Sequence, residues 1–152
     1  MLVRNTQVRI AQNGKTVPVE SLSIADKVYD AATGTYDEIV DILARTLDYH
    51  RAARIGLHPI RLAKDALRAG YPTDETHVSP NQGVLLVAHG PCNSVYKHLV
   101  ERRASDLTAA QPVAAWDKLT YFCVFFARKR YLQVNGLRLS AYTLEDIIHA
   151  RP

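Results

Sequence analysis

The sequence lacks long apolar runs, a secretory leader and a dense set of cysteines. No apolar run approaches the ~20 residues that a membrane-spanning helix needs, and Met1 to Arg4 do not follow the charged-then-apolar profile of a signal peptide. We therefore expect a cytoplasmic protein without membrane association. Two cysteines, Cys92 and Cys123, do not make a disulfide framework in 152 residues, so both are expected as free thiols.

Strong charge of one sign is also missing, as are internal repeats and low-complexity tracts. The 19 Lys and Arg residues against 15 Asp and Glu give a net charge of +4, and nucleic-acid binders usually concentrate more positive charge on one face or helix. The histidines follow no metal-ligand spacing, and a single His-x-x-Cys, at His89 to Cys92, falls short of the four ligands of a zinc site. We expect no metal and no other cofactor.

What the sequence does contain is the composition of a folded domain with turn signals typical of β structure. Apolar residues make up 47 % of the chain, which suffices for a core, and the length predicts a single domain over 1–152. Asn13-Gly14 and Asn135-Gly136 stand between runs of strand-forming residues, the best short signal for a hairpin. Further strands are predicted at 76–78, 83–87, 119–126, 131–134 and 137–139.

Helical patterns are few and short. Residues 39–47 follow the apolar spacing of one helical face. Residues 64–69 form a short helical pattern closed by Gly70, and 95–102 are compatible with another short helix. Residues 143–150 predict a terminal helix in which Thr143 caps and Asp146 completes the capping box. The stretch 106–117 is interpreted as loop.

Four stretches, taken in order, resemble bacterial Hint domains, the relatives of hedgehog autoprocessing domains and inteins. The first is TQVRIAQNGKTVPVESL at 6–22, followed by Asp26-Lys27-Val28. The others are HPIRL at 58–62, VSPNQGVLL at 78–86 and LTYFCVFF at 119–126. The resemblance implies an all-β, horseshoe-like fold of twisted hairpins with few short helices. It also replaces the helix over 39–47 by a strand.

The resemblance further implies a site, whose first position is altered in this chain. In the family, a leading cysteine or serine attacks the preceding backbone carbonyl, a step that needs an activated nucleophile. The spacing to Thr6 puts Met1 at that position, and Asn5 where the family commonly has glycine. A thioether cannot attack a carbonyl, and a chain that starts at Met1 offers no preceding peptide bond.

Two more positions depart from the family pattern. The family loop commonly reads Thr or Ser, Pro, any residue, His, and its imidazole protonates the departing nitrogen. Here the loop is Ser79-Pro80-Asn81-Gln82, and an amide cannot exchange a proton. Cys123 stands near a position that is often histidine, within an apolar strand where a buried, small hydrophobic role is expected. The positions that match the family site are therefore Met1, Ser79, Gln82 and Cys123.

These departures predict a degenerate Hint-like domain without autoprocessing activity that acts as a binding or interaction module. An unknown protein partner or a second copy would cover the aromatic strand at 119–126. One alternative is a self-cleaving domain whose native nucleophile is absent from this chain. A second is a small basic nucleic-acid binder that uses Arg128-Lys129-Arg130 beside Tyr131, an outcome that the low charge disfavours.

Overall fold

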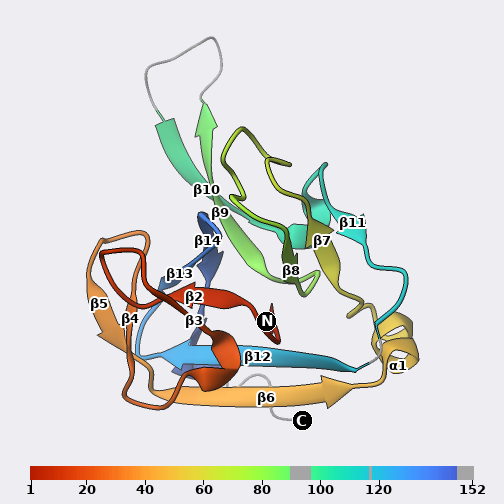
Figure 1. Ribbon diagram of the computed structural model, residues 1–152, viewed down its shortest axis with the longest axis horizontal. Helices are drawn as coiled ribbons and strands as arrows, with labels where there is room; N and C mark the ends of the chain where they lie inside the picture. Colours follow the sequence, from red (N-terminus) through yellow and green to blue (C-terminus); the bar gives the residue numbers. More distant parts are fainter. Residues whose placement is uncertain (90–96, 117, 147–152) are drawn as a thin grey trace.

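A computed structural model describes residues 1–89, 97–116 and 118–146. Strands dominate it, and they form two large sheets and a two-stranded ribbon (Figure 1). The mainly β class predicted from the sequence is confirmed. No helix among the described residues is long and apolar enough to cross a membrane.

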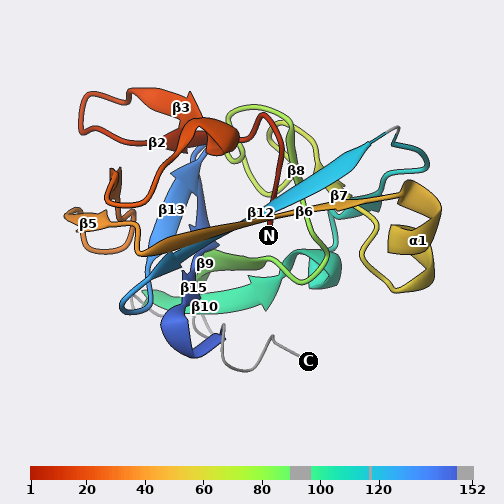
Figure 2. The same ribbon diagram turned by 90° about the horizontal axis from the view of Figure 1, so that it is seen from below.

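The first sheet carries the start of the chain in its interior. Its strands lie in the order β11 (Gln111–Pro112), β7 (Ile60–Leu62), β8 (Thr76–Val78), β1 (Leu2–Val3), β12 (Leu119–Phe126) and β15 (Tyr142–Thr143), and β6 (Asp41–Leu47) also pairs with β12. β6 and β12 are long neighbours that run along the bottom of the molecule in Figure 1 and across its middle in Figure 2, which is seen from below. β1 is thus flanked by strands on either side.

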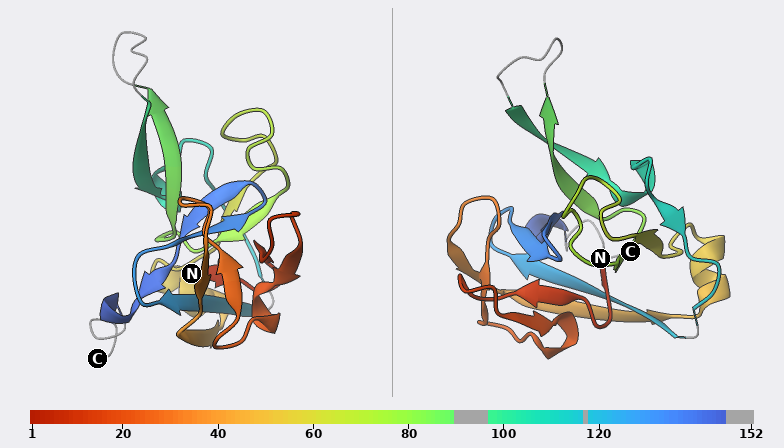
Figure 3. Two further views of the ribbon diagram at one scale, coloured as in Figure 1. Left: turned by 90° about the vertical axis from the view of Figure 1, so that its left-hand side faces the viewer. Right: turned by 45° about the horizontal axis from the view of Figure 1, so that its top comes forward.

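The second sheet ends in a long hairpin that projects from the body. Its order is β10 (Lys97–Arg103), β9 (Gly83–His89), β14 (Leu137–Ser140), β13 (Tyr131–Val134), β2 (Gln7–Arg9) and β3 (Thr16–Pro18). Figure 3 shows β9 and β10 extending away from the other strands in both views. The ribbon consists of β4 (Lys27–Tyr29) and β5 (Tyr36–Glu38).

The two Asn-Gly pairs form turns that connect the predicted hairpins. Asn135 and Gly136 both have positive φ, at 46° and 78°, as a two-residue turn between β13 and β14 requires. Between β2 and β3, Gly14 adopts φ 86° and its N–H donates to the carbonyl of Ala11 at 3.1 Å. Local turn chemistry therefore sets two of the hairpins.

The residues of β6 illustrate how pairing overrides a helical pattern. Residues 39–47 have helical spacing, but Asp41 to Leu47 pair in continuous antiparallel register with Phe125 to Leu119. Ile39, just before the strand, is 1 % exposed in the main core. The strand implied by the family resemblance is confirmed.

Two predicted helices are wrong. At 64–69, Asp65 has φ 61°, its N–H donates to the carbonyl of Pro72, and Leu67 bonds back to Tyr71, so the segment is a compact loop. At 97–103, the chain forms β10, because each residue pairs across to β9. Residues 95 and 96 of that prediction lie outside the described part.

The helices that are present are short. The sequence analysis missed α1 (Tyr49–Arg54), where the Asp48 carboxylate caps the helix by accepting the Arg51 N–H at 3.1 Å. Two 3₁₀ turns are also present, η1 (Val19–Ser21) and η2 (Ala104–Asp106). At the predicted terminal helix, residues 144–146 are helical and Asp146 accepts from the Thr143 N–H at 2.6 Å, and the remainder lies outside the described residues.

The buried apolar residues form two clusters. The larger joins residues of both sheets, including Val8, Val84 and Phe126, and the smaller packs Tyr121 and Leu119 of β12 against α1. Among the described residues, no buried side-chain polar atom lacks a hydrogen-bond partner. The buried side chains of Ser79 and Gln82 therefore have hydrogen-bond partners.

Candidate functional site

The α-nitrogen of Met1 lies at the centre of a buried polar cluster. It donates to the Gln82 Oε1 at 2.6 Å, to the Tyr142 hydroxyl at 3.0 Å and to the Ser79 Oγ at 3.2 Å. Met1, the loop that carries Ser79 and Gln82, and Tyr142 are remote from one another in sequence, so only the tertiary fold brings them together. The cluster contains three of the site positions predicted from the sequence.

The first sheet positions these groups through β1. Leu2 pairs with Val78 on one side and with Phe122 on the other, so Met1 lies beside Ser79 and, by continuation of the antiparallel register, opposite Cys123. The Ser79 N–H donates to the Met1 carbonyl at 3.0 Å. The fourth predicted position thus adjoins the same nitrogen.

The loop that carries Ser79 and Gln82 is held on both sides. Within it, the Gln82 N–H donates to the Ser79 carbonyl at 3.0 Å. The 3₁₀ turn η2 then supplies two N–H groups, from Ala104 to the Gln82 carbonyl at 2.8 Å and from Ser105 to the Pro80 carbonyl at 3.0 Å. These bonds fix the direction of both side chains toward Met1.

Gln82 faces the Met1 nitrogen with its oxygen. Its Nε2 donates to the Ser140 carbonyl at 2.7 Å and to the Gly83 carbonyl at 3.1 Å, and the side chain is 2 % exposed. Because two carbonyl oxygens can only accept, the amide cannot be turned over without losing both bonds. Gln82 is therefore a fixed acceptor toward residue 1.

Burial favours the neutral form of each titratable group in the cluster, and because a neutral α-amine has two N–H groups for its three partners, one of the two hydroxyls would then donate to the nitrogen. Desolvation lowers the pKa of the Met1 α-amine to about 5, against an opposing contribution from Cys123. Burial also raises the pKa of the Cys123 thiol, although the α-amine and Arg45 act in the other direction. The pKa of Tyr142 is raised by burial, and further by Cys123 and Asp146.

A comparison with protein families identifies the fold. A family model described as a Hint domain matches residues 2–146. The chain belongs to the Hint domain family. No curated protein matches it. The family implied by the ordered stretches in the sequence is thereby confirmed. Ser79, Gln82 and Cys123, which lie in those stretches, adjoin the nitrogen of Met1 in this Hint domain.

The sequence analysis missed Tyr142 as a member of the site. β15 runs parallel to β12, with Tyr142 beside Phe125 in register, and the two rings pack with centroids 5.5 Å apart. Parallel pairing of a two-residue strand with a distant one leaves no local pattern, so the sequence carried no signal for it. The ring packing and the bond to Met1 together orient its hydroxyl.

Cys123 differs from the core residue expected at that position. It is half-buried rather than buried, whereas Val124, Phe125 and Phe126 are buried. Its half-buried position next to residue 1 makes it the one sulfur nucleophile adjoining the described cluster. Because the raised pKa keeps the thiol protonated, its nucleophilicity at neutral pH is low.

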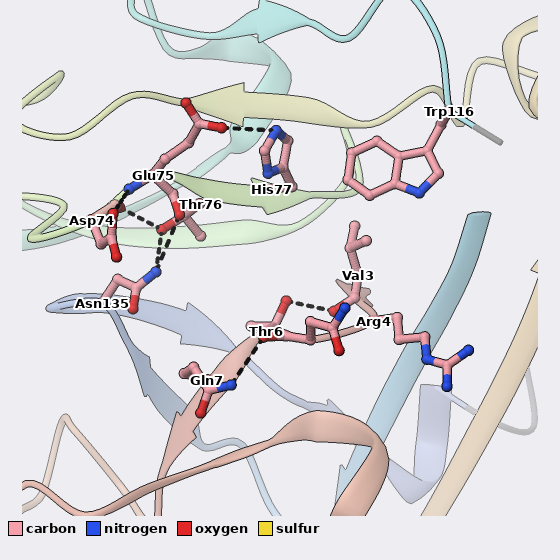
Figure 4. A pocket seen from close by; sticks show the side chains of 11 residues that line it. Val3, Arg4, Thr6, Gln7, Asp74, Glu75, Thr76, His77, Trp116 and Asn135 are labelled. Carbon is pink, nitrogen blue, oxygen red and sulfur yellow. Dashed lines mark hydrogen bonds and ion pairs between the residues drawn. The ribbon is translucent and has the colours of Figure 1, made fainter. Parts of the chain in front are cut away.

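The imidazole closest in sequence to the loop points elsewhere. His77 lies on β8, and Figure 4 shows it between Glu75 and Trp116, in a pocket of about 310 Å³ that Val3 and Thr6 also line. Its Nε2 is 3.5 Å from the Glu75 Oε1, and its ring lies 5.1 Å from that of Trp116. Burial lowers the pKa of His77 despite the raising effect of Glu75, with Arg61 lowering it further. The pocket contains none of Met1, Ser79, Gln82 or Cys123.

A second groove, of about 360 Å³, adjoins the cluster itself. Its lining includes Tyr142, Ser140 and Gly83, together with Glu101 and Lys129 of the neighbouring hairpins. A Cβ on Gly83 would come within 2.1 Å of the Glu101 Oε1 and 2.2 Å of the Ser140 Oγ. Glycine at this position therefore lets those two side chains approach the site loop.

The basic corner after β12 is largely neutralised within the molecule. Arg130 pairs with Asp37 and lies 3.7 Å from the buried Asp30, Arg128 lies 3.8 Å from Asp37, and Lys129 lies 3.4 Å from Glu101. Although partial burial acts to raise it, the pKa of Asp37 is lowered overall by its bonds to Arg130 and Glu38 and by nearby arginines. Over the described residues, no three His, Cys, Asp or Glu side chains gather in a possible metal site.

Proposed function

We propose that this Hint domain does not carry out the acyl shift and serves as a binding or interaction module. The observation that carries the proposal is the orientation of Gln82. Expulsion of the residue 1 nitrogen from a peptide bond requires a proton donor near that nitrogen, a contribution worth ~10²–10⁴ in rate. Gln82 presents an acceptor there, and its two N–H groups are committed to Ser140 and Gly83.

The other groups around the nitrogen support the same proposal. Met1 has a thioether in place of a nucleophile. Ser79 and Tyr142 carry hydroxyls that hydrogen-bond the nitrogen, but neither ionises or donates a proton readily near neutral pH, and burial raises the pKa of Tyr142 further. The cluster is well suited to hold residue 1 in place and poorly suited to cleave ahead of it.

One observation favours a second candidate, cleavage driven by Cys123. The register of β1 and β12 places this cysteine opposite Met1, within reach of a peptide bond that precedes residue 1 in a longer chain. Its raised pKa opposes this role. We therefore rank cleavage by Cys123 second, and the Cys123→Ser variant in the experiment below distinguishes it.

A reporter fusion tests both candidates. A folded reporter joined ahead of Met1 is purified and incubated with dithiothreitol and, separately, with hydroxylamine, and intact mass is followed over time. We expect the fusion to remain whole. Release of the reporter would contradict the proposal, and loss of that release in Cys123→Ser would assign the reaction to Cys123.

A further inference from the structure

Among the residues that the structure describes, one edge of β9 has no strand partner over the outer half of the hairpin. It pairs with β10 along its whole length, from Gly83 to His89, but with β14 its only register pair is Val84 with Leu139. β14 begins at Leu137, directly after the Asn135–Gly136 turn, and the Tyr71 hydroxyl lies at this end of the pairing: it accepts the Arg138 N–H at 3.3 Å and donates to the Leu85 carbonyl at 3.5 Å.

The direction of the free backbone groups follows from strand alternation. The Gln82 carbonyl faces β10, where it accepts the Ala104 N–H, whereas the Leu85 carbonyl faces Tyr71. Because alternate residues of a strand direct their N–H and C=O to opposite edges, Val87 directs both of its groups to the same side as Leu85. Val87 is 39 % exposed.

A groove of about 640 Å³ lies along this free edge. Its lining includes Leu86 and Val87 of β9, Leu67, Arg68 and Tyr71 of the preceding loop, and Arg138 of β14. None of its described lining residues is acidic. The Gly136 turn packs closely against the loop, since a Cβ there would lie 3.7 Å from both the Gly70 carbonyl and the Tyr71 ring, which holds the two walls together.

The charged side chains of the groove indicate the charge of the ligand that it would bind. Arg68 stacks on Tyr71 with its guanidinium carbon 5.1 Å from the ring centroid. Neither Arg68 nor Arg138 forms an ion pair with any residue that the structure describes, in contrast to the paired arginines after β12. Two unpaired guanidinium groups over an apolar floor complement carboxylates that alternate with apolar side chains.

We propose that this groove binds an extended acidic peptide segment of a partner protein, which adds to the free edge of β9 as a further strand. The inference rests on the proposed role as an interaction module and specifies its ligand. The peptide backbone pairs with Val87, alternate apolar side chains enter the groove beside Leu67 and Leu86, and carboxylates meet Arg68 and Arg138.

Labelled peptides test the proposal. The probe is a fluorescein-labelled octapeptide of alternating valine and glutamate, compared by anisotropy with its valine–lysine counterpart and with a version in which a central valine is proline. We expect saturable binding of the glutamate peptide with a Kd below about 500 μM, and binding about tenfold weaker or worse for the other two. Amide shifts in a ¹⁵N spectrum should centre on Leu85 and Val87.

Charge reversal supplies the matched variants. Arg68→Glu with Arg138→Glu should reverse the preference in favour of the lysine peptide, whereas Lys15→Glu with Lys118→Glu, the same change of net charge outside the groove, should leave it in place. No binding of the glutamate peptide at about 1 mM, equal binding of both charged peptides, or shifts away from β9 would overturn the proposal. Tighter binding of a labelled single-stranded oligonucleotide to the same residues would also overturn it, in favour of a nucleic-acid ligand.

The two proposals fail separately. If the peptide does not bind and the reporter fusion stays whole, the proposed peptide ligand is wrong and the proposal that the domain does not process itself still holds. If the reporter fusion is cleaved but the protein still binds the peptide at β9, the proposal of an inactive site is wrong and the proposed peptide ligand still holds.

Discussion

Gln82 exemplifies how one buried residue joins three parts of the chain. Its amide bonds Met1, Gly83 and Ser140, and replacing it by leucine leaves buried partners without a bond. We expect Gln82→Leu to lower the free energy of unfolding by about 3 kcal/mol, measured by urea denaturation. Gln12→Leu, at an exposed position, is the control and should change stability by less than about 0.5 kcal/mol. Equal, small effects would show that the bonds of Gln82 contribute little.

The Met1 α-amine has a titration of its own. In protein whose chain starts at Met1, its pKa of about 5 lies below the ordinary 8.0, so the folded state binds fewer protons than the unfolded state between these values. Stability should therefore fall as the pH is lowered from 8 to 5 and level off below that range. Methionine occurs once, so a selective ¹³C label gives one signal, whose midpoint we expect near 5. A midpoint near 8 would contradict the burial of the neutral amine.

At this scale, the sequence predicted part of the site. Ser79, Gln82 and Cys123 were identifiable because they sit in stretches that resemble the family, and Met1 followed from the spacing to Thr6. Tyr142 was not, since it reaches the site through a parallel pairing with β12. The orientation of the Gln82 amide also depended on Ser140, which lies 58 residues away.

Among the elements, α1 offers the cleanest local test. Asp48 caps it through one bond to the Arg51 N–H. We expect Asp48→Ala to lower the free energy of unfolding by about 1 kcal/mol and Asp48→Asn, which keeps an acceptor, to have a far smaller effect. Thermal denaturation of both variants provides the comparison. Equal losses would mean that the carboxylate acts through its charge rather than as a cap.

Element prediction succeeded where local chemistry and burial agreed. Strands β12 and β13 have the bounds read from the sequence, 119–126 and 131–134, because their apolar runs lie between polar corners. It failed at 64–69, where the left-handed backbone of Asp65 and the bond to Pro72 curl the chain. It failed at 97–103 because pairing with β9, a tertiary effect, decides that segment.

For the whole molecule, the pattern of charges predicts weak binding to nucleic acid. The three basic residues after β12 each have an acidic partner, so few cations are free to replace the counterions of a phosphate backbone. We expect a Kd for a labelled duplex above about 1 μM at physiological salt, since non-specific binders typically lie at about 10⁻⁴–10⁻⁶ M. Salt-sensitive binding tighter than this would revive the interpretation as a basic nucleic-acid binder.

The fold brings together the four positions that the family resemblance assigns to an acyl-shift site, and the residues at two of them indicate which substitutions should restore the reaction. Met1→Cys supplies a nucleophile and Gln82→His supplies a group able to protonate the leaving nitrogen. Because residues that act as a unit are not additive, both changes are needed. Cys123→Ser in the same background removes the thiol that lies opposite residue 1, so that cleavage can be attributed to the cysteine introduced at residue 1.

The ratio of two cleavage rates tests the central claim, that Gln82 is a fixed acceptor which prevents departure of the residue 1 nitrogen. A reporter is fused ahead of residue 1 in Met1→Cys/Cys123→Ser, with and without Gln82→His, and reporter release by dithiothreitol is timed by mass spectrometry, with ¹⁵N spectra confirming that both proteins are folded. We predict that the protein carrying Gln82→His releases the reporter at least about 10² faster than the protein that retains Gln82. Equally fast release from the protein that retains Gln82, or no release from either, would contradict the account.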